Sequence, residues 1–233
     1  MSSYTQIKVE LQSTIQSHKT FDKFCKTGPG DYAEHDKFLG IRTSDIRKLA
    51  LKYKNIPLQE VQLLIDSPFN EERLLALLIL VRRYEKGTIQ DKDLVYQYYL
   101  RNLKQVNNWN LVDSSAHMII GAYSIRQNNT DILFTLARSS IMWERRIAMV
   151  ATWWFIRKGN TAVPLTIAEI LLYDAHDLIH KAIGWMLREV GKHNQTHLIA
   201  FLDQHAHHMP RISLRYALEK FSPAQKQYYL SLK

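Results

Sequence analysis

The chain has 233 residues and is 46% hydrophobic, enough to bury the core of one large domain or one continuous array of repeats. Its formal net charge of +9 favours an anionic partner, and most of the excess lies in residues 101–233, which contain 16 Lys and Arg against 9 Asp and Glu. The single cysteine, Cys25, excludes an internal disulfide framework, and no apolar run approaches the ~20 residues of a membrane-spanning helix. We therefore expect a cytoplasmic protein that does not enter a membrane.

Helical periodicity runs through the chain, and no segment shows the strict alternation of a half-buried strand. A first pair of helices is predicted over residues 4–17 and 21–26, followed by the strong loop signal Gly28-Pro29-Gly30-Asp31. The side chains of Thr43, Ser44 or Asp45 are expected to cap the next helix, which runs to about residue 53. Further helices are predicted over residues 58–66, 70–85, 91–103, 109–125, 131–138, 142–158, 164–173, 177–192, 195–205, 212–221 and 223–232.

One short helical pattern recurs along the chain in five segments, which begin at Glu72, Trp109, Arg145, His180 and Leu214. The second residues of successive segments are 37, 36, 35 and 34 residues apart. A period of this length is typical of stacked antiparallel helix pairs, about six of them here, which form a superhelical solenoid. Because the connections are short and no long linker occurs, we predict an all-α fold with residues 1–233 in a single domain.

Equivalent positions of successive repeats line the same side of a solenoid. That side would carry a stripe of basic residues, interrupted by Trp109 and Asp113: Arg73, Arg146, Lys181 and Arg215. Trp109 and Asp113 are four residues apart and therefore share one helix face, as Lys181, Trp185 and Arg188 do on a later helix. We expect both faces to line one concave basic groove that holds two indole rings and one carboxylate.

These residues also have a purely structural interpretation. An isolated tryptophan on a helix most often belongs to the core, and Asp113 could simply pair with a nearby arginine. The asparagines at positions 107, 108 and 110 argue against a core position for Trp109, because they are typical of an exposed helix start that makes hydrogen bonds. By contrast, Trp153 or Trp154, within an apolar segment, is expected in the core, and Cys25 is expected to be an ordinary buried residue.

The ten histidines do not indicate a metal site. His205, His207 and His208 match no zinc-binding spacing, and no cysteines accompany them. The chain also has no glycine-rich phosphate loop. A basic groove with two tryptophans is the feature that the residues support, and no metal is expected.

Several segments resemble one known family. Residues 107–113 (NNWNLVD), 143–148 (WERRIA) and above all 181–189 (KAIGWMLRE) are similar to the AlkD family of DNA alkylation repair glycosylases, which are built from HEAT-like helical repeats. Residues 38–41 (FLGI) and 214–217 (LRYA) agree with this resemblance, so it spans almost the whole chain.

The resemblance implies hydrolysis of the N-glycosidic bond of N3- or N7-alkylated purines in double-stranded DNA, without a metal or organic cofactor. It implies that Trp109, Asp113 and Trp185 form the catalytic cleft. The predicted contacts to the DNA backbone are Arg146 and Arg188 near the lesion, with Arg42, Arg145, Lys181 and Arg215 as further basic residues. Such a protein would act as a monomer and would lie at the nucleoid when bound to DNA.

Two other functions fit the same sequence features. A noncatalytic binder of damaged or branched DNA would keep the basic stripe and use Asp113 only as a structural partner. A helical scaffold for other proteins would show no salt-dependent DNA binding at all. Release of free base from alkylated DNA separates the glycosylase from both, because function depends on the site and not on the fold.

Overall fold

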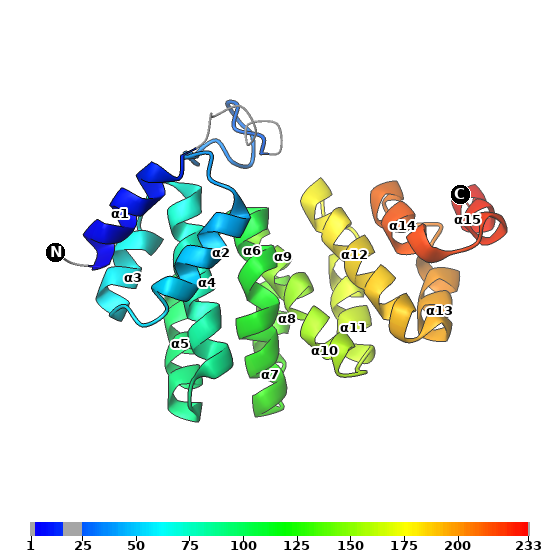
Figure 1. Cartoon of the computed structure of the whole chain (residues 1–233). Coiled ribbons are helices and arrows are strands. Elements are labelled where there is room, and N and C mark those ends of the chain that lie inside the picture. The colour runs from blue at the N-terminus through cyan, green and yellow to red at the C-terminus, as the bar shows by residue number, and fades with distance from the viewer. Residues whose placement is uncertain (1–2, 16–24, 233) are drawn as a thin grey trace. The chain divides into compact units, whose positions relative to one another are not determined.

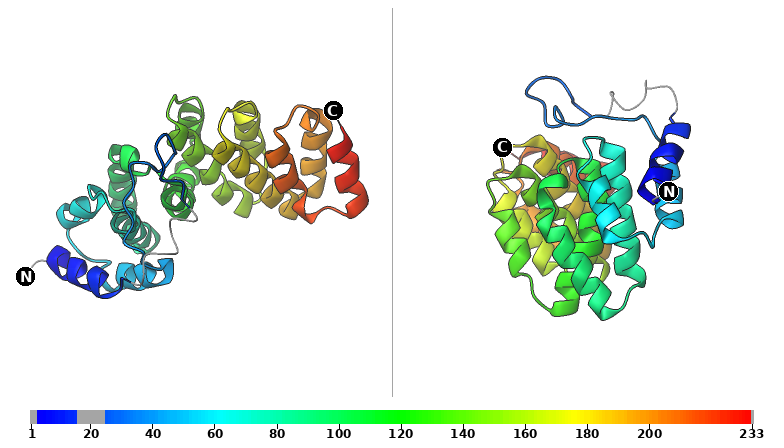
Figure 2. Two further views of the ribbon diagram at one scale, coloured as in Figure 1. Left: turned by 90° about the horizontal axis from the view of Figure 1, so that it is seen from above. Right: turned by 90° about the vertical axis from the view of Figure 1, so that its left-hand side faces the viewer.

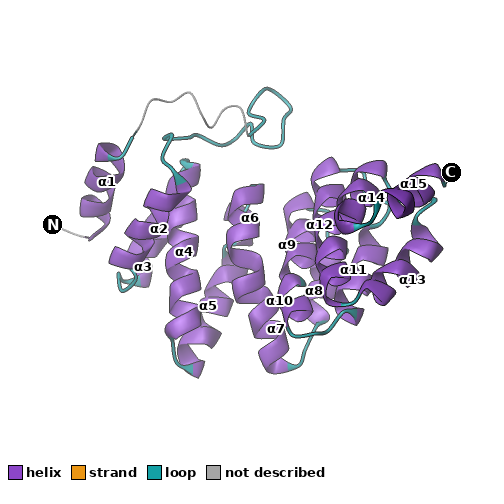
Figure 3. Ribbon diagram, turned by 45° about the vertical axis from the view of Figure 1, so that its right-hand side comes forward, coloured by secondary structure: helices purple, strands orange, loops and turns teal. Residues whose placement is uncertain are grey.

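The structure, a computed structural model, describes residues 3–15 and 25–232 (Figure 1). Within these ranges the chain forms helices without any strand, and Lys37 and Phe69 make one isolated bridge (Figure 3). Most connections are short, but residues 25–42 form a long segment without a helix. The predicted all-α class is therefore confirmed. The helices group into two compact units, Met1–Ser115 and Ala116–Lys233, which are described separately below. The continuous solenoid and the single domain stay predictions.

Helix α4 is the centre of the first unit. The unit contains α1 (Ser3–Ser13), α2 (Thr43–Lys52), α3 (Leu58–Ile65), α4 (Asn70–Lys86), α5 (Ile89–Arg101), a 3-10 turn (Leu103–Gln105) and α6 (Trp109–Ala116). Helix α4 packs against α2, α3 and α5, and residues 70–81 are all buried. A helix covered on every side must be apolar on every side, as residues 74–81 (LLALLILV) are.

Helix α12 has the corresponding central place in the second unit. After a π-helical turn (His117–Gly121), this unit contains α7 (Ala122–Gln127), α8 (Asp131–Ala137), α9 (Met142–Ala151), α10 (Trp153–Arg157), α11 (Ala162–Leu171), α12 (Asp177–His193), α13 (Gln195–His205), α14 (Arg211–Ala217), a 3-10 turn (Leu218–Lys220) and α15 (Pro223–Ser231). Helix α12 packs against α9, α11, α13 and α14. The helices of this unit follow one another in chain order, from green to red in Figure 2.

The close packing of α12 against α14 depends on Gly184. A β-carbon at this position would lie 2.5 Å from the carbonyl oxygen of Ser213 and 2.5 Å from Cβ of Tyr216. Only a residue without a β-carbon allows the two helices to approach so closely. The glycine of the KAIGWMLRE segment therefore has a packing function between these helices.

Most predicted helices agree with the structure to within a few residues, but two are interrupted. The helix expected over residues 109–125 contains the π-helical turn, where a β-carbon on Gly121 would lie 2.2 Å from the carbonyl oxygen of Ala151. The helix expected over 142–158 breaks at Thr152, whose hydroxyl donates to the carbonyl oxygen of Met149 at 2.7 Å.

Two predictions near the N-terminus have different outcomes. The predicted side-chain cap at residues 43–45 is wrong, because α2 begins at Thr43 and its N-cap residue, Arg42, makes no side-chain cap. The helix predicted over 21–26 lies mostly outside the described residues, and Cys25 and Lys26 are not helical. No helix in the described part of the chain combines the length and apolar character needed to cross a membrane.

The expected core position of Trp153 or Trp154 is also wrong. Both side chains are partly exposed. The guanidinium of Arg157 lies 4.9 Å from the ring centroid of Trp153 and 5.7 Å from that of Trp154. His117 packs edge-on against Trp153 at 4.7 Å between ring centroids. The two indoles therefore make polar and cationic contacts near the surface.

Candidate active site

The first turn of α4 consists of buried polar residues. Asn70, Glu71, Glu72 and Arg73 are each at most 2% exposed. Glu71 accepts hydrogen bonds from the backbone N–H groups of Leu39 at 3.0 Å and Gly40 at 2.8 Å and thereby fixes the loop before α2. Burial raises the pKa of the Glu71 carboxyl, and these backbone donors act in the opposite direction.

Arg73 does not belong to an exposed basic stripe, and this prediction is wrong. Its side chain is buried and forms an ion pair with the carboxylate of Asp36. It also donates to the carbonyl oxygen of Ser67 at 2.9 Å. An isolated buried charge is unfavourable, so Arg73 and Asp36 stabilise each other inside the first unit.

Asp36 joins the start of α4 to the start of α6. Its Oδ2 accepts from Nδ2 of Asn70 at 2.9 Å and from Nδ2 of Asn108 at 2.5 Å. Next to it, Nδ2 of Asn110 donates to Oδ1 of Asn70 at 2.6 Å. The Asp36 network, as we name Asp36, Asn70, Arg73, Asn108 and Asn110, therefore holds the first turn of α6 in place. Asn108 is fully buried, so the expectation that it marks an exposed helix start is wrong.

Trp109 and Asp113 lie on α6, directly after this network. Both side chains are partly exposed, in contrast to Asn108, Leu111 and Val112 around them. Their spacing of four residues places them one turn apart on one face of the helix. The first unit therefore presents an indole ring and a carboxyl group together at the surface, on a helix whose start is fixed from inside.

The thiol of Cys25 contacts Trp109. Its sulfur lies beside the side chains of Trp109 and Asn108, which favour the ionised thiol. Burial raises the pKa of the Cys25 thiol to about 11, against the effect of these side chains. Cys25 is buried as expected, but its contact with Trp109 has no sequence signal, since the two residues are far apart in the chain.

The second unit carries the other predicted site residues on α12. Trp185 is partly exposed, and Lys181, one turn before it, is exposed without an ion pair to any described residue. The side chain of Arg188, which is 19% exposed, forms an ion pair with Glu219 and lies 3.5 Å from Glu189. Arg188 is thus partly neutralised, whereas Lys181 is open to an external anion.

Arg145 and Arg146 hold the segment that leads into α12. Nε of Arg145 donates to the carboxylate of Asp174 at 2.5 Å, and its Nη1 donates to the carbonyl oxygen of Ser140 at 3.0 Å. Arg146 is only 5% exposed, and its Nη1 donates to the carbonyl oxygen of Leu178. Both are therefore far less open than the predicted stripe requires, whereas Arg215 and Arg42 are exposed.

The comparisons with known proteins identify the family of the chain. The profile of a family described as DNA alkylation repair enzyme matches residues 8–221. The chain belongs to this family. The resemblance to the AlkD family is confirmed, and the function of this DNA alkylation repair protein lies in the repair of alkylated DNA. No curated protein sequence matches the chain.

Two solved structures share the fold of this DNA alkylation repair protein. One, described as a predicted DNA alkylation repair enzyme from Enterococcus faecalis, is 16% identical with a TM-score of 0.67, covering 90% of this chain and all of that chain. The other, AlkD2 from Streptococcus mutans, is 15% identical with a TM-score of 0.63, covering 95% of this chain and all of that chain. At this identity the likeness concerns the fold alone.

Proposed function

We propose that the protein is a monofunctional DNA glycosylase that hydrolyses the N-glycosidic bond of cationic N3- or N7-alkylated purines. The observation that carries this proposal is the pair Trp109 and Asp113, which are partly exposed on one face of α6 while Asn108, Leu111 and Val112 beside them are buried. The family gives the coarser function, repair of alkylated DNA. The pair supplies the groups that the glycosylase reaction needs.

The chemistry demands little of the protein. Alkylation at N3 or N7 makes the purine cationic, so the bond between the base and C1′ breaks with its electron pair going to the purine, which leaves as a neutral base. The remaining sugar cation would be stabilised by the carboxylate of Asp113, and a water molecule then adds to C1′ and loses a proton. The faces of Trp109 and Trp185 would attract the cationic base or sugar, each by ~0.5–2 kcal/mol.

We assign the contacts with the DNA backbone to the basic residues of the second unit and to Arg42. Lys181 and Arg215 are exposed and would bind phosphates directly, with an affinity that decreases as salt increases. Arg188 would exchange Glu219 for a phosphate. Arg145 is held by a carboxylate, so its guanidinium would meet a phosphate in a fixed position. Arg146 is buried and donates to the carbonyl oxygen of Leu178, so it would support the start of α12 rather than bind a phosphate itself. Phosphate contacts carry no sequence information, as suits a repair enzyme.

The decisive experiment compares wild-type protein with Asp113→Asn on DNA treated with a methylating agent. We expect wild-type protein to release N3- and N7-methylpurines, and the variant to bind the same duplex with similar affinity but to release at least 100-fold less base, roughly the loss caused by removing one electrostatic stabiliser. Undiminished release by the variant would refute the role of Asp113. Salt-dependent DNA binding without any release by wild-type protein would establish the noncatalytic alternative.

A further inference from the structure

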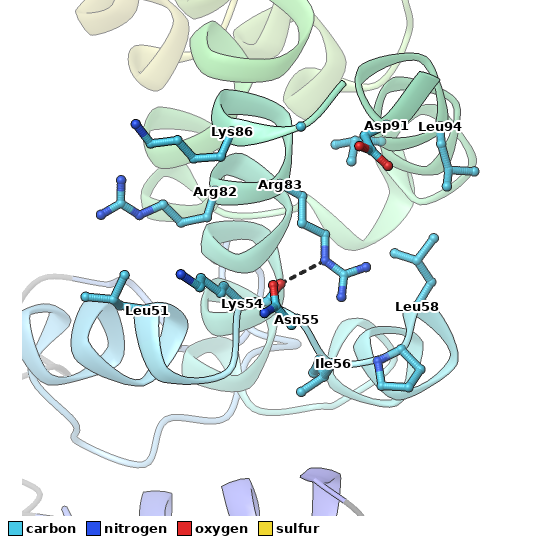
Figure 4. A pocket seen from close by; sticks show the side chains of 13 residues that line it. Leu51, Lys54, Asn55, Ile56, Leu58, Arg82, Arg83, Lys86, Asp91 and Leu94 are labelled. Carbon is cyan, nitrogen blue, oxygen red and sulfur yellow. Dashed lines mark hydrogen bonds between the residues drawn. The ribbon is translucent and has the colours of Figure 1, made fainter. Parts of the chain in front are cut away.

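A cavity of about 600 Å³ lies within the first unit, at the C-terminal end of α4 (Figure 4). Its walls come from the end of α2 and the connection to α3, the first residue of α3, the last turn of α4 and the connection and first residues of α5. Trp109, Asp113 and the Asp36 network lie outside this lining, since Asn70 and Arg73 occupy the opposite end of α4. The volume falls in the range of ~300–1,000 Å³ that is usual for small-molecule sites.

The lining is strongly basic. It contains Lys54, Arg82, Arg83 and Lys86 against one acid, Asp91. The Asp91 carboxylate is engaged in hydrogen bonds within its own helix cap: it accepts from the backbone N–H of Thr88 at 2.9 Å and from the hydroxyl of Thr88 at 2.8 Å. Lys54 and Lys86 form no ion pair with any residue in the described ranges. Arg82 is paired with Glu85 at 3.1 Å, so the cations that the cavity offers to a ligand are Lys54, Arg83 and Lys86.

Arg83 is held in the cavity by a backbone acceptor. Its side chain is half-buried, and Nε donates to the carbonyl oxygen of Lys54 at 3.0 Å. This bond fixes the plane of the guanidinium, and Figure 4 shows the group directed toward Leu58 and away from Arg82 and Lys86. The two terminal nitrogens have no hydrogen-bond partner in the described part of the chain. They can therefore donate to two oxygens of one oxyanion, such as a phosphate.

Large apolar side chains at the same cavity remain exposed. Leu51 and Leu94 are 51% and 52% exposed, and Ile56 and Leu58 complete an apolar wall near Arg83. Basic residues at the ends of α2 and α4 are favourable for the helices themselves through the helix dipole. That effect does not account for two exposed leucines beside them, whereas a ligand with an apolar body would cover these side chains.

We propose that this cavity binds a small organic phosphate of the size of a nucleoside monophosphate. Its phosphate would be bound by the terminal nitrogens of Arg83, with Lys54 and Lys86 adding positive charge to the same cavity, and its flat apolar body would lie against Leu58 and Leu94. This site is independent of the proposed glycosylase site, and its ligand needs neither Trp109 nor Asp113.

The test is calorimetric titration of the full chain with 2′-deoxyadenosine 5′-monophosphate. Separate titrations with inorganic phosphate and with 2′-deoxyadenosine measure the binding of the two parts of this ligand. We expect the monophosphate to bind, phosphate to bind at least tenfold more weakly, and the nucleoside to show no measurable heat. Absence of monophosphate binding at millimolar concentration would overturn the proposal. If inorganic phosphate binds as tightly as the monophosphate, the apolar wall does not contribute to binding and the proposed organic ligand is wrong.

Variants distinguish this cavity from any other anion site. Lys54→Glu combined with Lys86→Glu should weaken monophosphate binding at least tenfold. The matched control, Arg101→Glu combined with Lys104→Glu, makes the same change of charge at residues of the first unit outside the lining and should leave binding unchanged. Leu94→Trp, which fills the cavity without changing its charge, should also weaken binding. Equal losses in the control, or no loss in the cavity variants, would refute the site.

Discussion

Asn108 and Asp36 are 72 residues apart in the chain, yet Nδ2 of Asn108 lies 2.5 Å from Oδ2 of Asp36, and both residues are buried. Asn108 directly precedes Trp109, so this hydrogen bond ties the start of α6 to the loop before α2. The position of the proposed catalytic pair therefore depends on a carboxylate that itself lies inside the protein.

Asp36→Ala should strongly destabilise the protein. The substitution removes the ion-pair partner of Arg73 and one acceptor for both Asn70 and Asn108, and an unpaired buried charge costs about 3–5 kcal/mol. Urea unfolding measures this loss. The control is Asp45→Ala, which breaks the surface pair with Lys48 and should cost at most about 1 kcal/mol. Equal effects of the two substitutions would contradict the importance of the Asp36 network.

Cys25 should be inert toward alkylating reagents in the folded protein. With its thiol pKa raised to about 11 by burial, only about one thousandth of the thiol is ionised at pH 8. Because it is the only cysteine, mass spectrometry after iodoacetamide treatment reports this residue alone. We expect negligible labelling at pH 8 and complete labelling in urea; rapid labelling of the native protein would show that the thiol is accessible.

Cys25→Ala should slow base release several-fold without weakening DNA binding, because Trp109 would lose the thiol that lies beside its indole ring and helps to hold it in place. Cys25→Ser offers a hydroxyl oxygen at the same place and should recover part of the rate. Single-turnover release from methylated DNA is the measurement. If the alanine and serine variants lose the same activity, a polar atom at position 25 has no part in orienting Trp109.

Glu71 should make a distinct contribution to the pH dependence of stability. Its carboxyl pKa is raised in the folded protein from the ordinary value of 4.5, so the folded state holds this proton more tightly than the unfolded state. The free energy of unfolding contributed by Glu71 must then decrease as pH rises above about 4.5. Urea unfolding of wild-type protein and Glu71→Gln measures this effect between pH 4.5 and 7. The free energy of unfolding of wild-type protein should decrease relative to that of the variant as pH rises; an increase would contradict the raised pKa of Glu71.

Gly184→Ala should destabilise the second unit by about 1–3 kcal/mol, because the new β-carbon would overlap the carbonyl oxygen of Ser213 and Cβ of Tyr216. Gly191→Ala is the matched control on the same helix. There the nearest atom, at 2.5 Å, is the terminal Cδ2 of Leu198, which can rotate away. Thermal unfolding compares the two, and a smaller loss for Gly184→Ala would contradict the close approach of α12 and α14.

The local sequence determined the helices and the candidate residues on them. Periodicity of apolar residues predicts a helix wherever one face must be buried, and this signal lies within about ten consecutive residues, as in Leu58–Ile65 and Gln195–His205. The pair Trp109 and Asp113 could be selected for the same reason, since a spacing of four residues is a property of one helix.

The tertiary structure alone decided which polar residues are buried and paired. Arg73 and Lys181 hold corresponding places in the repeat, yet Arg73 is enclosed with Asp36 whereas Lys181 is exposed. Nothing near Arg73 in the sequence indicates Asp36, which lies 37 residues earlier in a loop. Burial and ion pairing depend on contacts between distant segments, and these form only when the helices pack.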